Sequence, residues 1–156
     1  MDDILGKMVA ILLAAFVFAG IPVIYMRERA KTAEQMYLLS MVTEFVDSMC
    51  NVGFVDYTMY RQFLQEVAAA SGLYQVQILH EQKELLYSDG EYSYVSTYYD
   101  EEDMIEQLLV GECYQFAQGD YVKVTILQEK GSFHLPGIQD ATMNLFYGGT
   151  VRYATY

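Results

Sequence analysis

A long apolar run near the N-terminus constrains this chain more than any other feature. Residues 8–26 read MVAILLAAFVFAGIPVIYM and contain no charged side chain. As a helix these 19 residues span roughly 28 Å, close to the ~30 Å hydrocarbon core of a bilayer. The core helix of a soluble domain is rarely apolar on all sides over such a length. We therefore predict a single membrane-spanning helix that runs from Met8 through Phe16 and Pro22 to Met26.

A cleaved signal peptide is the competing interpretation of this run, with Val17-Phe18-Ala19 as a tolerable cleavage site. The apolar run continues past that site to Met26, however. The flank before the run, MDDILGK, carries two acids and one base, whereas a signal peptide begins with net positive charge. We expect the helix to be retained, with residues 1–31 forming the anchor and its flanks.

The rest of the chain is predicted to be an acidic domain that folds in water. Residues 32–156 contain five basic and eighteen acidic side chains, a net charge of −13. Such a domain repels nucleic acids and anionic lipid headgroups, because both carry negative charge. We therefore exclude nucleic acid as a partner and expect the bilayer to contact only the apolar helix.

The charges beside the run bear on orientation. Lys7 precedes it, whereas Arg27, Arg29 and Lys31 follow it directly. The positive-inside rule then favours an acidic domain on the cytoplasmic side. The difference is only two charges, so this rule leaves the opposite orientation open.

The hydrophobic pattern becomes periodic after the basic flank. No glycine or proline occurs between Ile24 and Cys50. The spacing i, i+3, i+4, i+7, i+8, i+11 of one helix face is occupied by Leu38, Met41, Val42, Phe45, Val46 and Met49. The sequence predicts one long helix, half in the membrane and half an amphipathic stem on the soluble core, ending near Gly53.

Turn residues and alternating side chains divide the remainder into short elements. Asp56 and Asp100 suit the N-termini of two helices that end at Gly72 and Gly111. Strands are predicted at 73–80, at 84–87 and 92–96 about an Asp89-Gly90 hairpin turn, at 121–127, and as two short strands about Gly148-Gly149, with a loop at 129–141. The expected fold is α+β, with the stem helix packed on a small antiparallel or mixed sheet.

Sequence motifs for catalysis are missing. The chain has no GxSxG, GxxxxGK[ST], GxGxxG or HExxH motif. His80 continues the inward side of its strand without partners at ligand spacing, so a structural role is favoured over acid–base or metal chemistry. His134 falls in the predicted loop, and the acidic run 100–103 lacks the alternate spacing of a calcium loop. We expect no catalytic, cofactor-binding or metal site and no small-molecule substrate; an enzyme that uses His80 is the competing hypothesis.

The cysteines and tyrosines leave two further alternatives open. Cys50 and Cys113 would permit one disulfide outside the cytoplasm, or they are two free thiols. The chain has fifteen tyrosines and no tryptophan. Either the tyrosines form a contact surface, because a tyrosine offers much area at little entropic cost, or they cap a small core. The tyrosines considered for that surface are Tyr92, Tyr94, Tyr98 and Tyr99.

The order of an apolar helix, an amphipathic stem and a small α/β domain resembles a type IV pilin or pseudopilin. Residues 45–82 in particular are similar to pilin-like membrane proteins of Gram-positive bacteria associated with Tad-type pilus gene clusters. The motifs that carry this resemblance are Phe45-Val46-Asp47, Gly53, Tyr60-Arg61-Gln62-Phe63, Gly72-Leu73-Tyr74-Gln75-Val76, His80, Gly119-Asp120-Tyr121 and Tyr147-Gly148-Gly149.

The resemblance implies a non-enzymatic subunit of an envelope pilus or secretion-type assembly. Its partners would be other pilin-like or membrane subunits, and its folded domain would lie outside the cytoplasm. The chain lacks a basic leader with a glycine cleavage site, and Leu5 stands where pilins carry a glutamate that assists filament packing. This departure favours an unprocessed accessory subunit. A membrane-tethered sensor or ligand-binding domain is the alternative from a different functional class.

Overall fold

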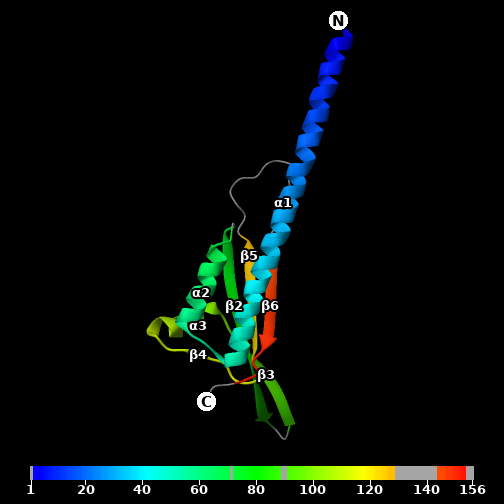
Figure 1. Cartoon of the computed structure of the whole chain (residues 1–156). Coiled ribbons are helices and arrows are strands. Elements are labelled where there is room, and N and C mark those ends of the chain that lie inside the picture. Colours follow the sequence, from blue (N-terminus) through cyan, green and yellow to red (C-terminus); the bar gives the residue numbers. More distant parts are fainter. Residues whose placement is uncertain (1, 71, 89–90, 129–143, 154–156) are drawn as a thin grey trace. The chain divides into compact units, whose positions relative to one another are not determined.

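The protein is described by a computed structural model that covers residues 2–70, 72–88, 91–128 and 144–153 (Figure 1). It divides into two compact units, residues 1–36 and residues 37–156. We call the second unit the head. Its predicted Asp89-Gly90 turn, the 129–141 loop and His134 lie outside the described residues.

The N-terminal unit consists of the first part of helix α1, which covers Asp2–Val52 and contains Pro22. Met8, Phe16, Pro22 and Met26 are all exposed, Phe16 to 83%. Helix α1 is long and apolar enough to cross a membrane, and its most apolar stretch has no buried side chain among the described residues. The helix predicted from the apolar run is therefore confirmed, and it is compatible with a single membrane span.

The last part of α1 belongs to the head and supplies much of its core. All six residues of the predicted helix face are buried, together with Cys50: Leu38, Met41, Val42, Phe45, Val46 and Met49. The helix ends at Val52, and Gly53 follows with a φ of 76° while its N–H donates to the Met49 carbonyl at 2.9 Å. A positive φ of this kind favours glycine, which explains the stop at this position.

The main sheet of the head has four antiparallel strands in the order β3-β2-β5-β6. These are β2 (Tyr74–Ser88), β3 (Glu91–Tyr99), β5 (Tyr121–Gln128) and β6 (Asn144–Thr150). The inward side chains of the two central strands are buried: Val76, Ile78 and His80 of β2, and Val122, Val124 and Ile126 of β5. The predicted alternation is confirmed, because successive side chains of a strand point to opposite faces.

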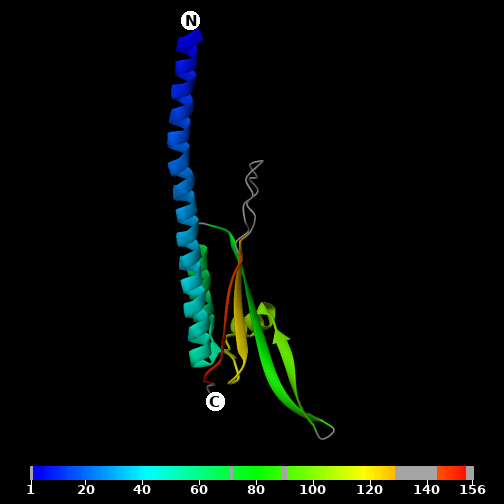
Figure 2. The same cartoon turned by 90° about the vertical axis from the view of Figure 1, so that its right-hand side faces the viewer.

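Two helices and a small second sheet complete the head. They are α2 (Tyr57–Ala68), α3 (Glu101–Val110), and the paired two-residue strands β1 (Phe54–Val55) and β4 (Tyr114–Gln115). Helix α2 lies beside the last turns of α1 on one side of the sheet (Figure 2), where the Phe45 and Phe63 rings stack with centroids 4.2 Å apart. A hydrogen bond from the Tyr60 hydroxyl to the Glu101 carboxylate, 2.6 Å long, joins α2 to α3.

The predicted helix starts are confirmed by their caps. The Asp56 side chain accepts from the Met59 N–H at 2.7 Å. Asp100 and Asp103 form a capping box at the start of α3, and Gly111 ends that helix with a φ of 89°. Helix α2, however, ends at Ala68, before the predicted Gly72.

Two strand predictions were wrong. The segments predicted as separate strands at 73–80 and 84–87 form one strand, β2, and the segments about Gly148-Gly149 also form one strand, β6. The glycines serve close packing instead of a turn. A Cβ atom at Gly148 would collide with the Tyr121 hydroxyl, and one at Gly149 would lie 3.0 Å from the Cys50 sulfur. They allow α1 and a neighbouring tyrosine to approach the sheet.

Candidate functional site

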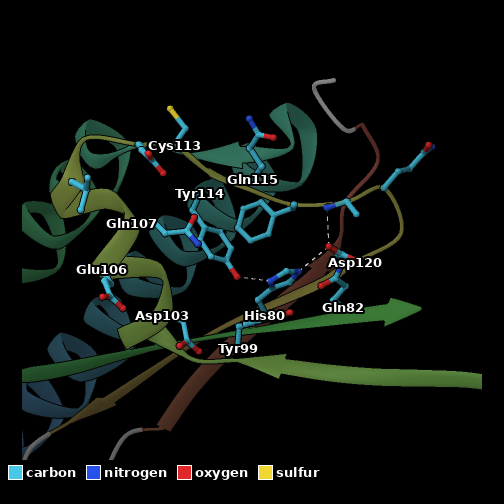
Figure 3. A pocket seen from close by; sticks show the side chains of 15 residues that line it. His80, Gln82, Tyr99, Asp103, Glu106, Gln107, Cys113, Tyr114, Gln115 and Asp120 are labelled. Carbon is cyan, nitrogen blue, oxygen red and sulfur yellow. Dashed lines mark hydrogen bonds and ion pairs between the residues drawn. The ribbon is translucent and has the colours of Figure 1, made fainter. Parts of the chain in front are cut away.

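The feature of the head with the most chemical potential is a buried histidine with two polar partners. His80 lies on the inward face of β2, following Val76 and Ile78, and is 5% exposed. Its Nδ1 lies 2.8 Å from the Tyr114 hydroxyl of β4, and its Nε2 lies 2.8 Å from Asp120 Oδ2, in the turn before β5 (Figure 3). Three segments of the head therefore meet at one imidazole ring.

The protonation of Tyr114 bears on the direction of these hydrogen bonds. Burial, together with the nearby Tyr99 hydroxyl and the Asp103 and Asp120 carboxylates, raises the pKa of Tyr114 to about 12. The phenol therefore stays protonated at neutral pH and can donate to Nδ1 of a neutral imidazole. Nε2 then carries the proton and donates to Asp120, as expected for a carboxylate that orients a histidine.

Asp120 also holds its own turn in place. Its Oδ2 accepts the Ala117 N–H at 2.7 Å, and its carbonyl accepts the Val151 N–H at 2.8 Å. The residue is 2% exposed, and its carboxylate is hydrogen-bonded by Ala117 and His80. A buried carboxylate of this kind needs such partners, since an unpaired charge in the interior is strongly unfavourable.

Aromatic rings enclose the imidazole. Tyr99 stacks on it at a centroid distance of 5.4 Å, while Tyr114 and Phe116 meet it edge-on at 5.6 and 5.0 Å. The rings separate the His80–Asp120 pair from water, which strengthens its electrostatic interaction.

The network forms the floor of a groove of about 970 Å³ between β2, α3 and the 112–120 segment (Figure 3). The lining is polar and carries four carboxylates but no lysine or arginine; the carboxylates are Asp103, Glu106, Glu112 and Asp120. Among the residues that the structure describes, no three histidine, cysteine, aspartate or glutamate side chains converge to hold a metal ion.

The geometry limits what His80 can do chemically. Both ring nitrogens are engaged in hydrogen bonds, so neither can serve a substrate or a metal until one of those bonds breaks. A general base needs a nitrogen within hydrogen-bond reach of the proton it removes. The observed arrangement is suited to holding β2, β4 and the turn before β5 together.

The two cysteines occupy different environments. Cys50 is buried in the core and Cys113 is exposed at the groove, and both are free thiols. No disulfide joins the two residues considered for pairing. Burial, reinforced by the Asp47 carboxylate and opposed by Arg152, raises the pKa of the Cys50 thiol. The exposed thiol of Cys113 is therefore the accessible nucleophile of this pair.

The four tyrosines considered as a contact surface divide between two faces of the sheet. Cross-strand pairing sets Tyr92 opposite Tyr87, Tyr94 opposite Leu85, and Tyr98 opposite Glu81. Paired residues share a face, so the first three tyrosines lie on the side away from His80. Tyr99 pairs with His80 and stacks on its ring. We call the exposed set the tyrosine face; its members are Leu85, Tyr87, Tyr92, Tyr94 and Tyr98.

Sequence reasoning placed His80 on the inward face but missed Tyr114 and Asp120. A buried histidine needs hydrogen-bond partners, so the alternation of β2 was a signal that partners exist. Their identity was not accessible from spacing, because they lie 34 and 40 positions further along the chain. Comparison of the chain with protein families, curated proteins and solved structures finds no match.

Proposed function

We propose that this protein is a non-enzymatic, pilin-like or accessory subunit of an envelope pilus or secretion-type assembly. A single helix holds it in the cell membrane, and its head lies outside the cytoplasm and offers contact surfaces to other subunits. The proposal rests on the layout of the chain and on the sequence resemblance over residues 45–82. The occupied ring nitrogens of His80 favour a structural role for the head's buried network.

The contrast between the two parts of α1 carries this proposal. The described apolar side chains of residues 8–26 are exposed around the helix, whereas residues 38–50 of the same helix are periodic and build the head's core. Each Å² of apolar surface removed from water stabilises the protein by about 25 cal/mol. A continuous exposed apolar surface therefore marks a contact with a membrane or with another protein. Lipid, or the apolar helices of neighbouring subunits, would cover it.

Membrane extraction tests the anchor. We expect the full-length chain to stay in the membrane pellet after alkaline carbonate treatment. The pair Leu13→Asp with Phe16→Asp should release it, since each central aspartate disfavours insertion by ~2.5–3.5 kcal/mol. The pair Thr32→Asp with Gln35→Asp, at the same spacing beyond the apolar run, is the matched control and should remain in the pellet. Unmodified chain in the supernatant would refute the anchor.

The exposed thiol reports the orientation of the head. A membrane-impermeant maleimide should label Cys113 in intact cells if the head lies outside the cytoplasm. Cys50 should stay unlabelled, because it is buried and its pKa is raised by that burial. Cys113→Ser is the control and should abolish labelling. Labelling only after cell lysis would place the head in the cytoplasm, as the flanking charges favour.

A membrane-tethered sensor or ligand-binding domain is the second candidate, and the polar groove above His80 favours it. Its three exposed carboxylates, on Asp103, Glu106 and Glu112, suit a cationic ligand because the lining has no basic side chain. Thermal unfolding of the full-length protein in detergent, with and without polyamines or divalent cations, separates the two functions. A concentration-dependent rise of the melting temperature supports the sensor, and its absence for every ligand removes it.

A further inference from the structure

Most of the tyrosine face lies where, among the residues that the structure describes, the sheet has two strands. In the described part of the chain, only His80 and Glu81 of β2 pair with strands on both sides, and residues 82–88 pair with β3 alone. We call residues 82–88 and 91–97 the ribbon, and Tyr98 lies at its base, opposite Glu81. The ribbon extends beyond the ends of β5 and β6 in both views (Figures 1 and 2). A two-stranded ribbon is marginally stable in water, and this one exposes large apolar side chains, Tyr94 to 78%.

A second apolar surface lies between α2 and α3. It is a groove of about 220 Å³, which we call the α2–α3 groove, and it has space for an aromatic ring. Leu109 lies at this groove with 70% of its surface exposed, and Arg61 belongs to the same lining. Its full lining is Tyr57, Tyr60, Arg61, Leu64, Ile105, Leu108 and Leu109.

We propose that the tyrosine face of one copy of this chain docks into the α2–α3 groove of a second copy. The chemistry of the two surfaces matches. The groove offers apolar walls and one cation, and the ribbon offers tyrosine rings, which bind apolar walls and attract a guanidinium through their faces. Arg61 is one of only five basic residues in a domain of net charge −13, which makes its place in an apolar groove distinctive.

The positions of the two surfaces decide the type of assembly. The ribbon is formed by β2 and β3, and the groove by α2 and α3, so one copy can use both at once. A contact of this kind joins two different surfaces and is called heterologous. It links each copy to the next, and the assembly can continue along a row of copies. This inference rests on the proposed function, because a shared membrane anchor keeps neighbouring copies in the same orientation.

The contact is small, so it should depend on the membrane. Five exposed side chains on one side fall below the ~800 Å² per partner of a stable protein interface. Confinement to a membrane raises the effective concentration of each head near its neighbours. We therefore expect association of the full-length chain in membranes and little association in dilute detergent.

Crosslinking between two differently tagged copies tests the contact directly. In a Cys113→Ser background, one copy carries Tyr94→Cys and the other Leu109→Cys, and a short bismaleimide is added to the membranes. The control pair replaces Tyr94→Cys with Gln75→Cys, an exposed position of β2 outside the ribbon. We expect the yield of the mixed dimer to be at least tenfold higher with Tyr94→Cys than with this control. Adding Tyr92→Ser to the ribbon copy should lower that yield several-fold.

Three outcomes would overturn the inference. They are a mixed-dimer yield equal to that of the Gln75→Cys pair, a dimer formed only between two Tyr94→Cys copies, or crosslinks only to another protein. The substituted side chains are exposed, so we expect the protease resistance of the head to be unchanged. A misfolded variant would be detected by a loss of that resistance. Membrane retention is measured in the same sample, so loss of the crosslink with retention intact refutes the docking contact and leaves the proposed function standing.

Discussion

His80→Leu is expected to lower the free energy of unfolding by about 3 kcal/mol. Leucine removes the imidazole donor to the carboxylate of Asp120, a residue that is 2% exposed. The carboxylate then keeps the Ala117 N–H as a donor. A buried carboxylate that loses a hydrogen-bond donor carries most of that penalty, and the Tyr114 hydroxyl loses its acceptor as well. Chemical denaturation of the full-length protein in detergent measures the change.

Two controls separate this effect from a general loss of packing. Glu84→Leu changes an exposed residue on the same side of β2 and should alter stability by less than about 0.5 kcal/mol, as surface substitutions usually do. Adding Asp120→Asn to His80→Leu should restore part of the lost stability, because the uncompensated charge is gone. An unfolding free energy of His80→Leu equal to that of the unmodified chain would contradict the network as a stabilising element.

Phe45→Ala is expected to destabilise the head by about 3–5 kcal/mol. The Phe45 ring is buried, and it stacks on Phe63 with an angle of 1° between the ring planes. Truncation leaves a cavity between α1 and α2 that a packed core fills only in part. The measurement is again chemical denaturation, followed by the near-ultraviolet signal of the head.

Leu39→Ala provides the matched control for this core position. Leu39 lies on the same helix but is exposed, so its truncation should cost less than about 1 kcal/mol. Equal losses for Phe45→Ala and Leu39→Ala would mean that the last part of α1 is not packed in the head as described. The pair therefore tests the role of the stem independently of the membrane.

Periodicity predicted the stem helix well, because its information is local. The spacing from Leu38 to Met49 identified six residues that all proved to be buried. The caps at Asp56 and Asp100 were predictable for the same reason, since each side chain binds an N–H two or three residues away. Interactions within one turn of a helix can therefore be predicted from neighbouring residues.

Features that depend on distant segments were not predictable in this way. Gly148-Gly149 resembles a turn locally, yet its lack of side chains serves contacts with Tyr121 and Cys50, far apart in the sequence. The same holds for the partners of His80. Tyr99 was grouped with the other tyrosines by proximity, but its odd spacing from Tyr98 turns it to the opposite face. Strand parity could have separated it, whereas its ring contact with His80 could not have been foreseen.

The continuity of β2 has a mechanical consequence. Strand β2 runs without a break from the ribbon into the centre of the sheet. A force that pulls the ribbon along its axis is therefore transmitted directly into the core. The bonds of an antiparallel ladder lie perpendicular to the strands, so such a force loads the eight residue pairs between β2 and β5 in shear, all at once. A neighbouring molecule that pulls on the ribbon would therefore load all of these residue pairs together, instead of breaking them one after another.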